Sequence, residues 1–284
     1  MIENLDTETN ESTPEPLVSI LLVCYNFEMY FVEAIEAILA QDFDDYEIIV
    51  CDDFSTDGTR ALASEYRDKF PAKVRLSFTT SNLGTTKNAN QGFKLARGKY
   101  LCLTSGDDVF LPGKLSTQVR YMESNRNCVI CYHDQKVFKS SNPEGGVLLS
   151  SIEQPRSGNV RIVTAYGTFA GGSSMMVRMR NPRVLLRPSI KYASDWLFQI
   201  DCLAIGGTID YIPQVYAKYR RHECNVTVKH NVRNNIDNLR SIITIMLSYP
   251  WLSPWALHRL FMGSINVLKQ IMQRRQFYVV RSKD

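Results

Sequence analysis

The sequence predicts an α/β protein, with a mostly parallel β-sheet flanked by helices and a helical extension at the C-terminal end. Three observations predict this class. Short apolar runs such as residues 18–24 show no polar alternation, which is typical of strands that a parallel sheet buries on both faces. Each run is followed by apolar residues at helical spacing, and this alternation is typical of right-handed βαβ units. From residue 229 onward only helical spacing remains.

Strands and helices alternate regularly in the first part of the chain. We expect strands at residues 18–24, 46–51, 73–79 and 99–104, with helices at 28–40, 60–69 and 85–96 between them. Residues 55–59 supply hydroxyl and carboxylate groups that cap the second helix. Pro112 suits the first turn of a further helix. Beyond it the alternation loosens, and we expect a loop at 140–160, a helix at 193–205, a strand at 208–217 and helices at 231–248 and 254–274.

Length and composition exclude several classes of protein. With 44% hydrophobic and 22% charged residues the chain is neither disordered nor fibrous, and 284 residues can bury a substantial core without disulfides. The seven cysteines are scattered and odd in number, so they cannot form a complete disulfide framework, and a reducing cytosol suits them best. Cys128 and Cys131 have metal-site spacing, but the apolar residues between them favour a buried strand.

The two ends of the chain differ in character. Residues 1–16 are acidic and polar, and we expect a disordered tail. The apolar run 17–24 is too short for a signal peptide or a membrane span, so we expect a cytoplasmic protein. Residues 229–284 contain nine Lys or Arg, two Asp and no Glu among many apolar side chains. Such a basic amphipathic extension lies on the inner face of an anionic membrane, packs on the main domain or joins two copies in a homodimer, and the sequence leaves these alternatives open.

Polar residues follow four successive strands of the predicted sheet. They are Tyr25-Asn26, Asp52-Asp53, Asn82-Leu-Gly84 and Asp107-Asp108. In an open α/β sheet, ligands bind beyond the carboxyl ends of the strands. One such Asp would suggest only a helix cap. Four polar turns, two of them with paired acids, favour a ligand site instead.

The kind of ligand follows from what these turns lack. Residues 23–27 contain no GxGxxG, so the first turn has no glycine loop for the pyrophosphate of a dinucleotide. An acidic site that faces a diphosphate needs a cation between the two. Mg²⁺ or Mn²⁺ suits this position, because both accept carboxylate and phosphate oxygens. We therefore predict a Mn²⁺ or Mg²⁺ cofactor and no nucleic-acid partner.

Six motifs in the chain resemble those of glycosyltransferase family 2, in order and spacing. They are Val18-Ser-Ile with Tyr25-Asn26, the run from Val50 to Thr59, Asn82-Leu-Gly84, Asn90-Gln-Gly92, the run from Ala96 to Tyr100, and Gly106-Asp-Asp108 with Leu111-Pro112 and Lys114-Leu115. The resemblance implies the Rossmann-like GT-A fold. It also implies inverting transfer of a sugar from a nucleotide donor, as in bacterial polysaccharide or lipopolysaccharide synthesis.

The resemblance assigns roles to the residues at the strand ends. It implies that Asp52 accepts the N3–H of a uracil or thymine, and that Asp53 supports the strand end. The remaining nucleotide-sugar contacts fall on Val23, Tyr25, Asn26, Asn82, Lys87, Ser105, Gly106, Asp107, Arg220 and Arg221. Lys87 lies where a cation reaches the diphosphate, although surface lysines are usually solvated, and Lys94 is the weaker candidate.

The metal motif departs from the family pattern. The family's DxD falls on Ser105-Gly106-Asp107, so its first acid is Ser105 here. Asp107 is then the leading metal ligand, and Asp108 assists through water or by bracing the loop. The stretch from Tyr219 to His222 resembles the family's tyrosine-arginine-x-histidine segment, which implies His222 as a nitrogen ligand if the ion is Mn²⁺. Otherwise a His in a polar loop is an ordinary surface residue.

The catalytic base is expected further along the chain. Ser194-Asp195-Trp196 resembles the family's Glu-Asp-Trp segment, with Ser194 in place of the Glu. An inverting transfer needs one carboxylate to take the acceptor's hydroxyl proton, and the resemblance gives that role to Asp195. The alternative is that Asp195 only caps the helix that follows it.

The function predicted from these residues is metal-dependent transfer of a sugar to a hydroxyl of a glycan or lipid-linked glycan. The donor is a UDP-sugar, less favourably a dTDP- or GDP-sugar. We expect residues 17–111 to bind the nucleotide-sugar and residues 112–228 to bind the acceptor within one domain. Two alternatives stay open, a nucleotide-sugar-binding module with weakened catalysis and a sugar nucleotidyltransferase. The latter usually carries a glycine-rich basic loop after its first strand, which is missing here.

Overall fold

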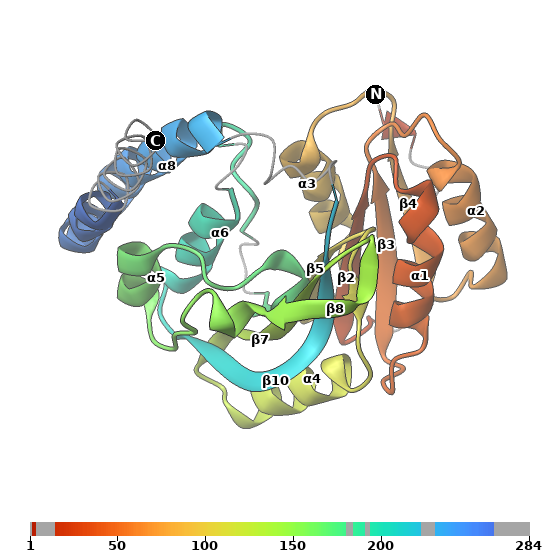
Figure 1. Ribbon diagram of the computed structural model, residues 1–284, viewed down its shortest axis with the longest axis horizontal. Helices are drawn as coiled ribbons and strands as arrows, with labels where there is room; N and C mark the ends of the chain where they lie inside the picture. The colour runs from red at the N-terminus through yellow and green to blue at the C-terminus, as the bar shows by residue number, and fades with distance from the viewer. Residues whose placement is uncertain (1, 4–14, 180–183, 191–193, 223–230, 264–284) are drawn as a thin grey trace, which may run out of the picture.

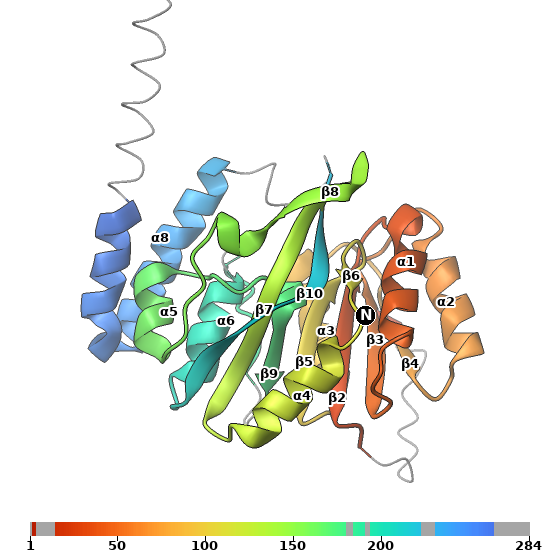
Figure 2. The ribbon, with the colours of Figure 1, turned by 60° about the horizontal axis from the view of Figure 1, so that its bottom comes forward.

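A computed structural model describes all residues except 1, 4–14, 180–183, 191–193, 223–230 and 264–284. Its centre is a ten-stranded sheet with helices packed on both faces (Figures 1 and 2). The strand order is β1-β4-β3-β2-β5-β9-β7-β10-β6, and β8 pairs with β7 outside this path. The α/β class predicted from the sequence is therefore confirmed.

The N-terminal part contains the alternating units that the sequence predicts. They are β2 (Val18–Cys24), α1 (Glu28–Leu39), β3 (Tyr46–Asp52), α2 (Thr59–Lys69), β4 (Val74–Thr79), α3 (Thr85–Leu95) and β5 (Tyr100–Ser105). All residues of β2 and β3 are buried, as expected for unalternating apolar strands of a parallel sheet. The four strands β4, β3, β2 and β5 are parallel.

The second part combines elements that the sequence predicts, such as the strand that begins at residue 208, with strands that it does not predict. It contains β6 (Val109–Phe110), α4 (Lys114–Ser124), β7 (Cys128–Lys139), β8 (Asn142–Leu148), α5 (Val160–Tyr166), β9 (Met175–Arg178), α6 (Ser194–Leu203) and β10 (Thr208–Arg221). Strand β9 runs antiparallel to both β5 and β7, so it joins the two parts of the sheet. Strand β10 pairs in parallel with β7 and in antiparallel with β6.

The structure differs from the expected local structure in three places. The predicted loop at 140–160 contains β8, whose residues are mostly exposed and pair along one edge with β7, so apolar periodicity could not reveal it. The strand expected at 208–217 continues to Arg221, because β7 supplies a partner along this whole length. Within the tail expected to be disordered, β1 (Ile2–Glu3) pairs with β4, while residues 4–14 lie outside the described residues.

Two apolar cores lie on opposite faces of the sheet. One contains Phe31 and Ile35 of α1, Tyr66 of α2, and Leu115 and Met122 of α4. The other lies under α3, α5 and α6, where Phe93 packs against Phe198 with ring centroids 5.4 Å apart. Cys128 and Cys131 are both buried in the first core, in agreement with the strand expected there.

The C-terminal extension begins with α8 (Asn231–Ser248), at the bounds that the sequence predicts. The 3₁₀ turn Pro250–Leu252 follows, and residues 253–263 are helical. Ile242, Ile245, Leu252 and Ala256 are buried in the core under α6. The described part of the extension, residues 231–263, thus packs on the main domain. No helix among the described residues combines the length and the apolarity needed to cross a bilayer.

Candidate functional site

The register of the parallel strands brings the predicted residues to one edge of the sheet. Cys24 pairs with Asp52, and Val23 pairs with Ser105, so β2, β3 and β5 end side by side. Across these ends the Cys24 carbonyl accepts the Asp53 amide at 3.0 Å, and the Val23 carbonyl accepts the Gly106 amide at 2.9 Å. We call the turns that begin at Tyr25, Asp53 and Gly106, together with the side chains that contact them, the strand-end cluster.

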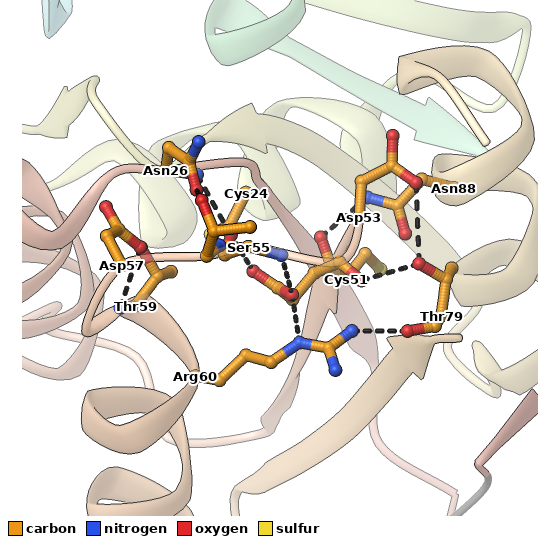
Figure 3. A network of polar contacts seen from close by, with 12 residues as sticks. Cys24, Asn26, Cys51, Asp53, Ser55, Asp57, Thr59, Arg60, Thr79 and Asn88 are labelled. Atoms are coloured by element: carbon orange, nitrogen blue, oxygen red, sulfur yellow. Dashed lines mark hydrogen bonds and ion pairs between the residues drawn. The ribbon is translucent and has the colours of Figure 1, made fainter. Parts of the chain in front are cut away.

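The turns after β2 and β3 are bonded to each other. Asn26 has a φ of 54°, and its side-chain oxygen accepts the Thr56 amide at 2.8 Å. The Asn26 amide donates to the Ser55 hydroxyl at 2.9 Å (Figure 3). Phe27 donates its amide to the Thr59 hydroxyl at 2.9 Å. These bonds hold the Tyr25-Asn26 turn in place while Tyr25 stays 44% exposed.

Asp52 is fully buried and engaged with protein groups. Its carboxylate accepts from Arg60 Nε at 2.5 Å, from the Ser55 amide at 2.9 Å and from the Ser55 hydroxyl. A nucleobase can therefore bind this carboxylate only if Arg60 moves away, or if Arg60 and the nucleobase bind the same carboxylate oxygen. Arg60 was not among the residues selected from the sequence, and no local pattern connects it with Asp52.

Asp53 holds the turn that follows β4. Its two oxygens accept the Leu83 amide at 2.7 Å and the Gly84 amide at 2.8 Å. Gly84 has a φ of 83°, a conformation that favours glycine. Asn82 is exposed in this turn, and Lys87 is exposed at the start of α3. Lys94 lies two turns further along α3, where its ammonium donates to Gln91 at 3.2 Å.

His222 and Asp107 meet although 115 positions separate them in the sequence. Strand β10 pairs with β6, with Lys218 opposite Val109, and so carries its end to the turn after β5. His222 Nε2 then lies 2.8 Å from Asp107 Oδ2, and both side chains are largely buried. The Tyr30 ring stacks on the His222 ring with centroids 5.1 Å apart, which fixes the imidazole plane.

Asp108 is buried beside this pair and braces the same turn. Its carboxylate accepts from the Ser173 hydroxyl and from the Arg220 amide at 3.0 Å. Burial, followed by the charge of Asp107, raises the pKa of Asp108 to about 8. Asp108 thus connects the turn after β5 with Gly172–Ser174 and with β10.

The two arginines at the end of β10 have different surroundings. Arg220 is 5% exposed, and its guanidinium donates to the Asp107 carbonyl at 2.8 Å and to the Glu33 carboxylate. The neighbouring residue, Arg221, is exposed, with its guanidinium 5.7 Å from the Tyr219 ring centroid. Only Arg221 of this pair is placed to meet a ligand from solvent, so the phosphate contact predicted for Arg220 requires its present bonds to break.

Asp195 lies in the first turn of α6 and is half-buried. Its Oδ1 accepts the Trp196 amide at 2.8 Å, and burial raises the pKa of its carboxyl. Ser194 beside it accepts the Thr86 hydroxyl at 3.4 Å, which links the start of α6 to the start of α3. The indole of Trp196 donates to the Val163 carbonyl at 2.8 Å and anchors the helix in the core.

The donors at Asp107 and His222 fit a divalent cation. Neighbouring ligands of an octahedral ion at about 2.1 Å are about 3 Å apart, close to the 2.8 Å found here. No group of three or more His, Cys, Asp or Glu side chains with metal-site geometry occurs among the described residues, so the protein would supply two ligands and substrate phosphate or water the rest. A nitrogen beside an oxygen suits Mn²⁺ better than Mg²⁺.

Phe54 is another residue that sequence reasoning missed. It follows Asp53 directly, has a φ of 64° and is 43% exposed. A bulky side chain in this left-handed region costs about 1–2 kcal/mol. Its position at a strand end was the only signal in the sequence, because backbone strain becomes visible only in the fold.

Comparison with known proteins identifies the family of this chain. The family model described as "Glycosyl transferase family 2" matches residues 19–180, more than half of the chain. The chain belongs to glycosyltransferase family 2.

An uncharacterised protein of Mycobacterium tuberculosis is 31% identical over 207 residues, which cover 72% of this chain and 59% of that protein. EpsE of Bacillus subtilis, named as a glycosyltransferase, is 32% identical over 162 residues, 57% of this chain and 56% of EpsE. The matched part of this family 2 chain spans less than two thirds of the length of either relative.

Solved structures show the same GT-A fold. Residues 1–349 of TarS from Staphylococcus aureus, in complex with UDP-GlcNAc, have a TM-score of 0.68 at 19% identity, over 86% of this chain and 72% of that one. The mannosyltransferase PcManGT from Pyrobaculum calidifontis, in complex with GDP-Man and Mn²⁺, has a TM-score of 0.60 at 15% identity, over 94% and 81% of the two chains.

Proposed function

We propose that this family 2 protein is an inverting glycosyltransferase that moves a sugar from a UDP-sugar to a hydroxyl of a glycan or lipid-linked glycan, as in the synthesis of a bacterial surface polysaccharide. A dTDP- or GDP-sugar is the less favoured donor. The observation that carries the proposal is the pairing of Asp107 with His222 at the carboxyl ends of β2, β3 and β5. The nucleotide-sugar complexes of TarS and PcManGT support it.

The metal dependence is part of the proposal. Asp107 and His222 would hold Mn²⁺, or less favourably Mg²⁺, and the ion would stabilise the charge on the departing diphosphate. Asp108 keeps the Asp107 turn in position through Ser173 and Arg220. Arg221 and Lys87, both exposed, would supply further positive charge to the phosphates.

Asp195 is the proposed catalytic base. Its carboxylate would take the proton from the attacking acceptor hydroxyl, while the sugar–phosphate bond breaks and the diphosphate leaves. A carboxyl pKa raised by burial suits this role, because the base then holds the proton more readily. The contact between Ser194 and Thr86 links the start of α6 to the start of α3, which follows the Asn82 turn.

Nucleoside recognition is assigned to the turns after β2 and β3. Tyr25 and Asn26 would shape the base pocket, with the backbone of Val23 beneath them. The contact predicted between Asp52 and the N3–H of the base stays a prediction, and the present geometry requires Arg60 to give way or to share an oxygen of Asp52.

A panel of nucleotide-sugars tests the proposal. The purified chain should hydrolyse or transfer the sugar of one UDP-sugar in the presence of Mn²⁺, and EDTA should abolish this activity. Binding of a donor without turnover of any donor or acceptor would favour the alternative of a binding module, which the serines at 105 and 194 support. Formation of a nucleotide-sugar from a nucleoside triphosphate and a sugar phosphate would favour the nucleotidyltransferase alternative.

We also propose that the C-terminal extension contacts an anionic membrane surface. Exposed apolar side chains continue along α8 and the helix after it, namely Ile236, Leu239, Ile243, Leu247, Trp251, Leu257, Leu260 and Phe261. The first four share one face of α8 by their spacing, whereas Ile242 and Ile245 face the core. The nine basic residues of 229–284, with two acidic ones, complement an anionic surface better than a second copy of the same basic segment.

Vesicle sedimentation tests this surface. The full chain should bind vesicles that contain phosphatidylglycerol and not vesicles of phosphatidylcholine alone. Leu247→Ser, at a side chain 78% exposed, should weaken binding, whereas the control Ile152→Ser, 61% exposed outside the extension, should not. Equal binding to both vesicles would contradict the charge argument. A concentration-dependent dimer that Leu247→Ser disrupts, without vesicle binding, would show that the surface is a homodimer contact.

A further inference from the structure

Phe54 has a backbone conformation that its side chain does not favour. Among the described non-glycine residues, only Asn26 and Phe54 have a positive φ. Asn26 tolerates this conformation because its short polar side chain bonds the Thr56 amide at 2.8 Å. The Phe54 side chain has no polar atom with which to compensate, and a bulky residue in the left-handed region is an outlier. The strain at Phe54 therefore needs another explanation.

Burial does not provide that explanation. Phe54 remains 43% exposed, and it is absent from both apolar cores. Its ring centroid lies 5.3 Å from the guanidinium carbon of Arg60, which in turn lies 4.9 Å from the Phe78 centroid. Arg60 is fixed by Asp52 at 2.5 Å. The ring thus rests on a rigid support at the strand-end cluster, with much of its surface open.

The neighbouring turn carries a second exposed aromatic side chain. Tyr25 is 44% exposed at the end of β2, and the bond from the Asn26 amide to the Ser55 hydroxyl at 2.9 Å holds the two turns together. Both aromatic residues therefore lie beyond the carboxyl ends of adjacent parallel strands, where open α/β sheets bind ligands.

We propose that Phe54 stacks on the nucleobase of the donor, and that its strained conformation is retained because it holds the ring in this position. The inference rests on the proposed function, because it requires a nucleotide donor. Local strain persists at functional sites where the surrounding structure imposes it. Stacking accepts any base, so Phe54 adds affinity for UDP and GDP alike, while hydrogen bonds from other groups select between them.

The variant Phe54→Asn separates the strained backbone conformation of this residue from its aromatic ring. Asn adopts the left-handed conformation readily, so Phe54→Asn relieves the strain while it removes the ring. We expect calorimetric titration to show UDP affinity lowered by about 5- to 100-fold, with the affinity for inorganic pyrophosphate in Mn²⁺ unchanged. The melting temperature should stay equal or rise. Phe54→Trp keeps an aromatic ring and should retain UDP affinity, and Phe70→Ala, at a residue 38% exposed beyond α2, is the matched control.

The outcomes distinguish this inference from the function on which it rests. If the wild-type chain binds UDP and Phe54→Asn binds it equally well, the stacking role is wrong and the proposed function stands. Weaker binding of both UDP and pyrophosphate, or a clearly lower melting temperature, would show that Phe54 only supports the turn. If the wild-type chain binds none of UDP, GDP and dTDP, the proposed function and the stacking role fail together.

Discussion

The imidazole of His222 lies 2.8 Å from the carboxylate of Asp107, across the junction between the end of β10 and the turn after β5. The sequence predicts both residues as metal ligands by resemblance, but their contact depends on the pairing of β10 with β6. Tyr30 stacks on the imidazole and Arg220 donates to the Asp107 carbonyl, so both partners are oriented before any ligand binds.

Asp107→Asn should reduce sugar transfer more than any other single change in the turn. Loss of the charged ligand weakens the hold on the cation, and His222 alone cannot replace it. We expect kcat to fall by at least about 100-fold, because the metal contributes several kcal/mol to stabilising the leaving diphosphate. Steady-state kinetics at saturating Mn²⁺ measures this. Asp108→Asn is the comparison, and a larger loss there would mean that Asp108 is the main ligand.

Ser105→Asp should strengthen metal binding. The change restores an acid at the first position of the metal motif and adds a negative charge next to Asp107. We expect the Mn²⁺ affinity to rise by about tenfold, since ligand charge sets the affinity of such sites. Titration of free Mn²⁺ by electron paramagnetic resonance measures this without turnover. Ser105→Asn controls for side-chain size, and an unchanged Mn²⁺ affinity in Ser105→Asp would place the ion away from residue 105.

Asp195→Asn should abolish transfer while the donor still binds. The amide cannot take the proton of the acceptor hydroxyl, and general-base catalysis contributes about 100- to 10,000-fold. Its oxygen can still accept the Trp196 amide, so α6 should keep its first turn. Kinetics of transfer and calorimetric titration with UDP measure the two effects. Transfer at the wild-type rate would show that Asp195 only caps the helix.

His133 should make the protein less stable in mild acid. It is buried, and burial followed by the charge of Lys114 holds the pKa of His133 well below its usual range. The imidazole takes up a proton near pH 6.5 in the unfolded chain and not in the folded one, so the contribution of His133 to the free energy of unfolding should fall as the pH drops below about 6.5, by up to about 1.4 kcal/mol per pH unit.

Urea denaturation at pH 5.5 and 7.5 checks the role of His133. The free energy of unfolding of His133→Gln, taken relative to the wild type, should rise from pH 7.5 to pH 5.5, because this comparison cancels the other titrating groups, Asp108 among them. The matched variant is His258→Gln, because the ring of His258 contacts Tyr166 outside the surroundings of His133. This variant should keep the pH dependence of the wild type. The same pH dependence in both variants and in the wild type would exclude His133 as its source.

Much of the N-terminal part could be predicted from the sequence because its signals are local. The apolar runs of β2 and β3, the helical spacing of α1 and the polar turn residues all lie within short segments. Parallel strands then align their carboxyl ends, so the meeting of Asp52, Asp53 and Asp107 at one edge follows from the order of the elements. In the second part, β8 pairs through its backbone with few buried side chains, and β9 is short, so neither produced a periodic signal.

Residue types and their spacing are enough to predict the fold class, the family and the polar residues at the strand ends. How those residues are used depends on the tertiary structure. It buried Asp52 against Arg60, assigned Asp53 to the Asn82 turn, enclosed Arg220 with Glu33 and left Arg221 exposed. Such contacts join residues from different elements, and they depend on strand register and helix packing rather than on any local pattern.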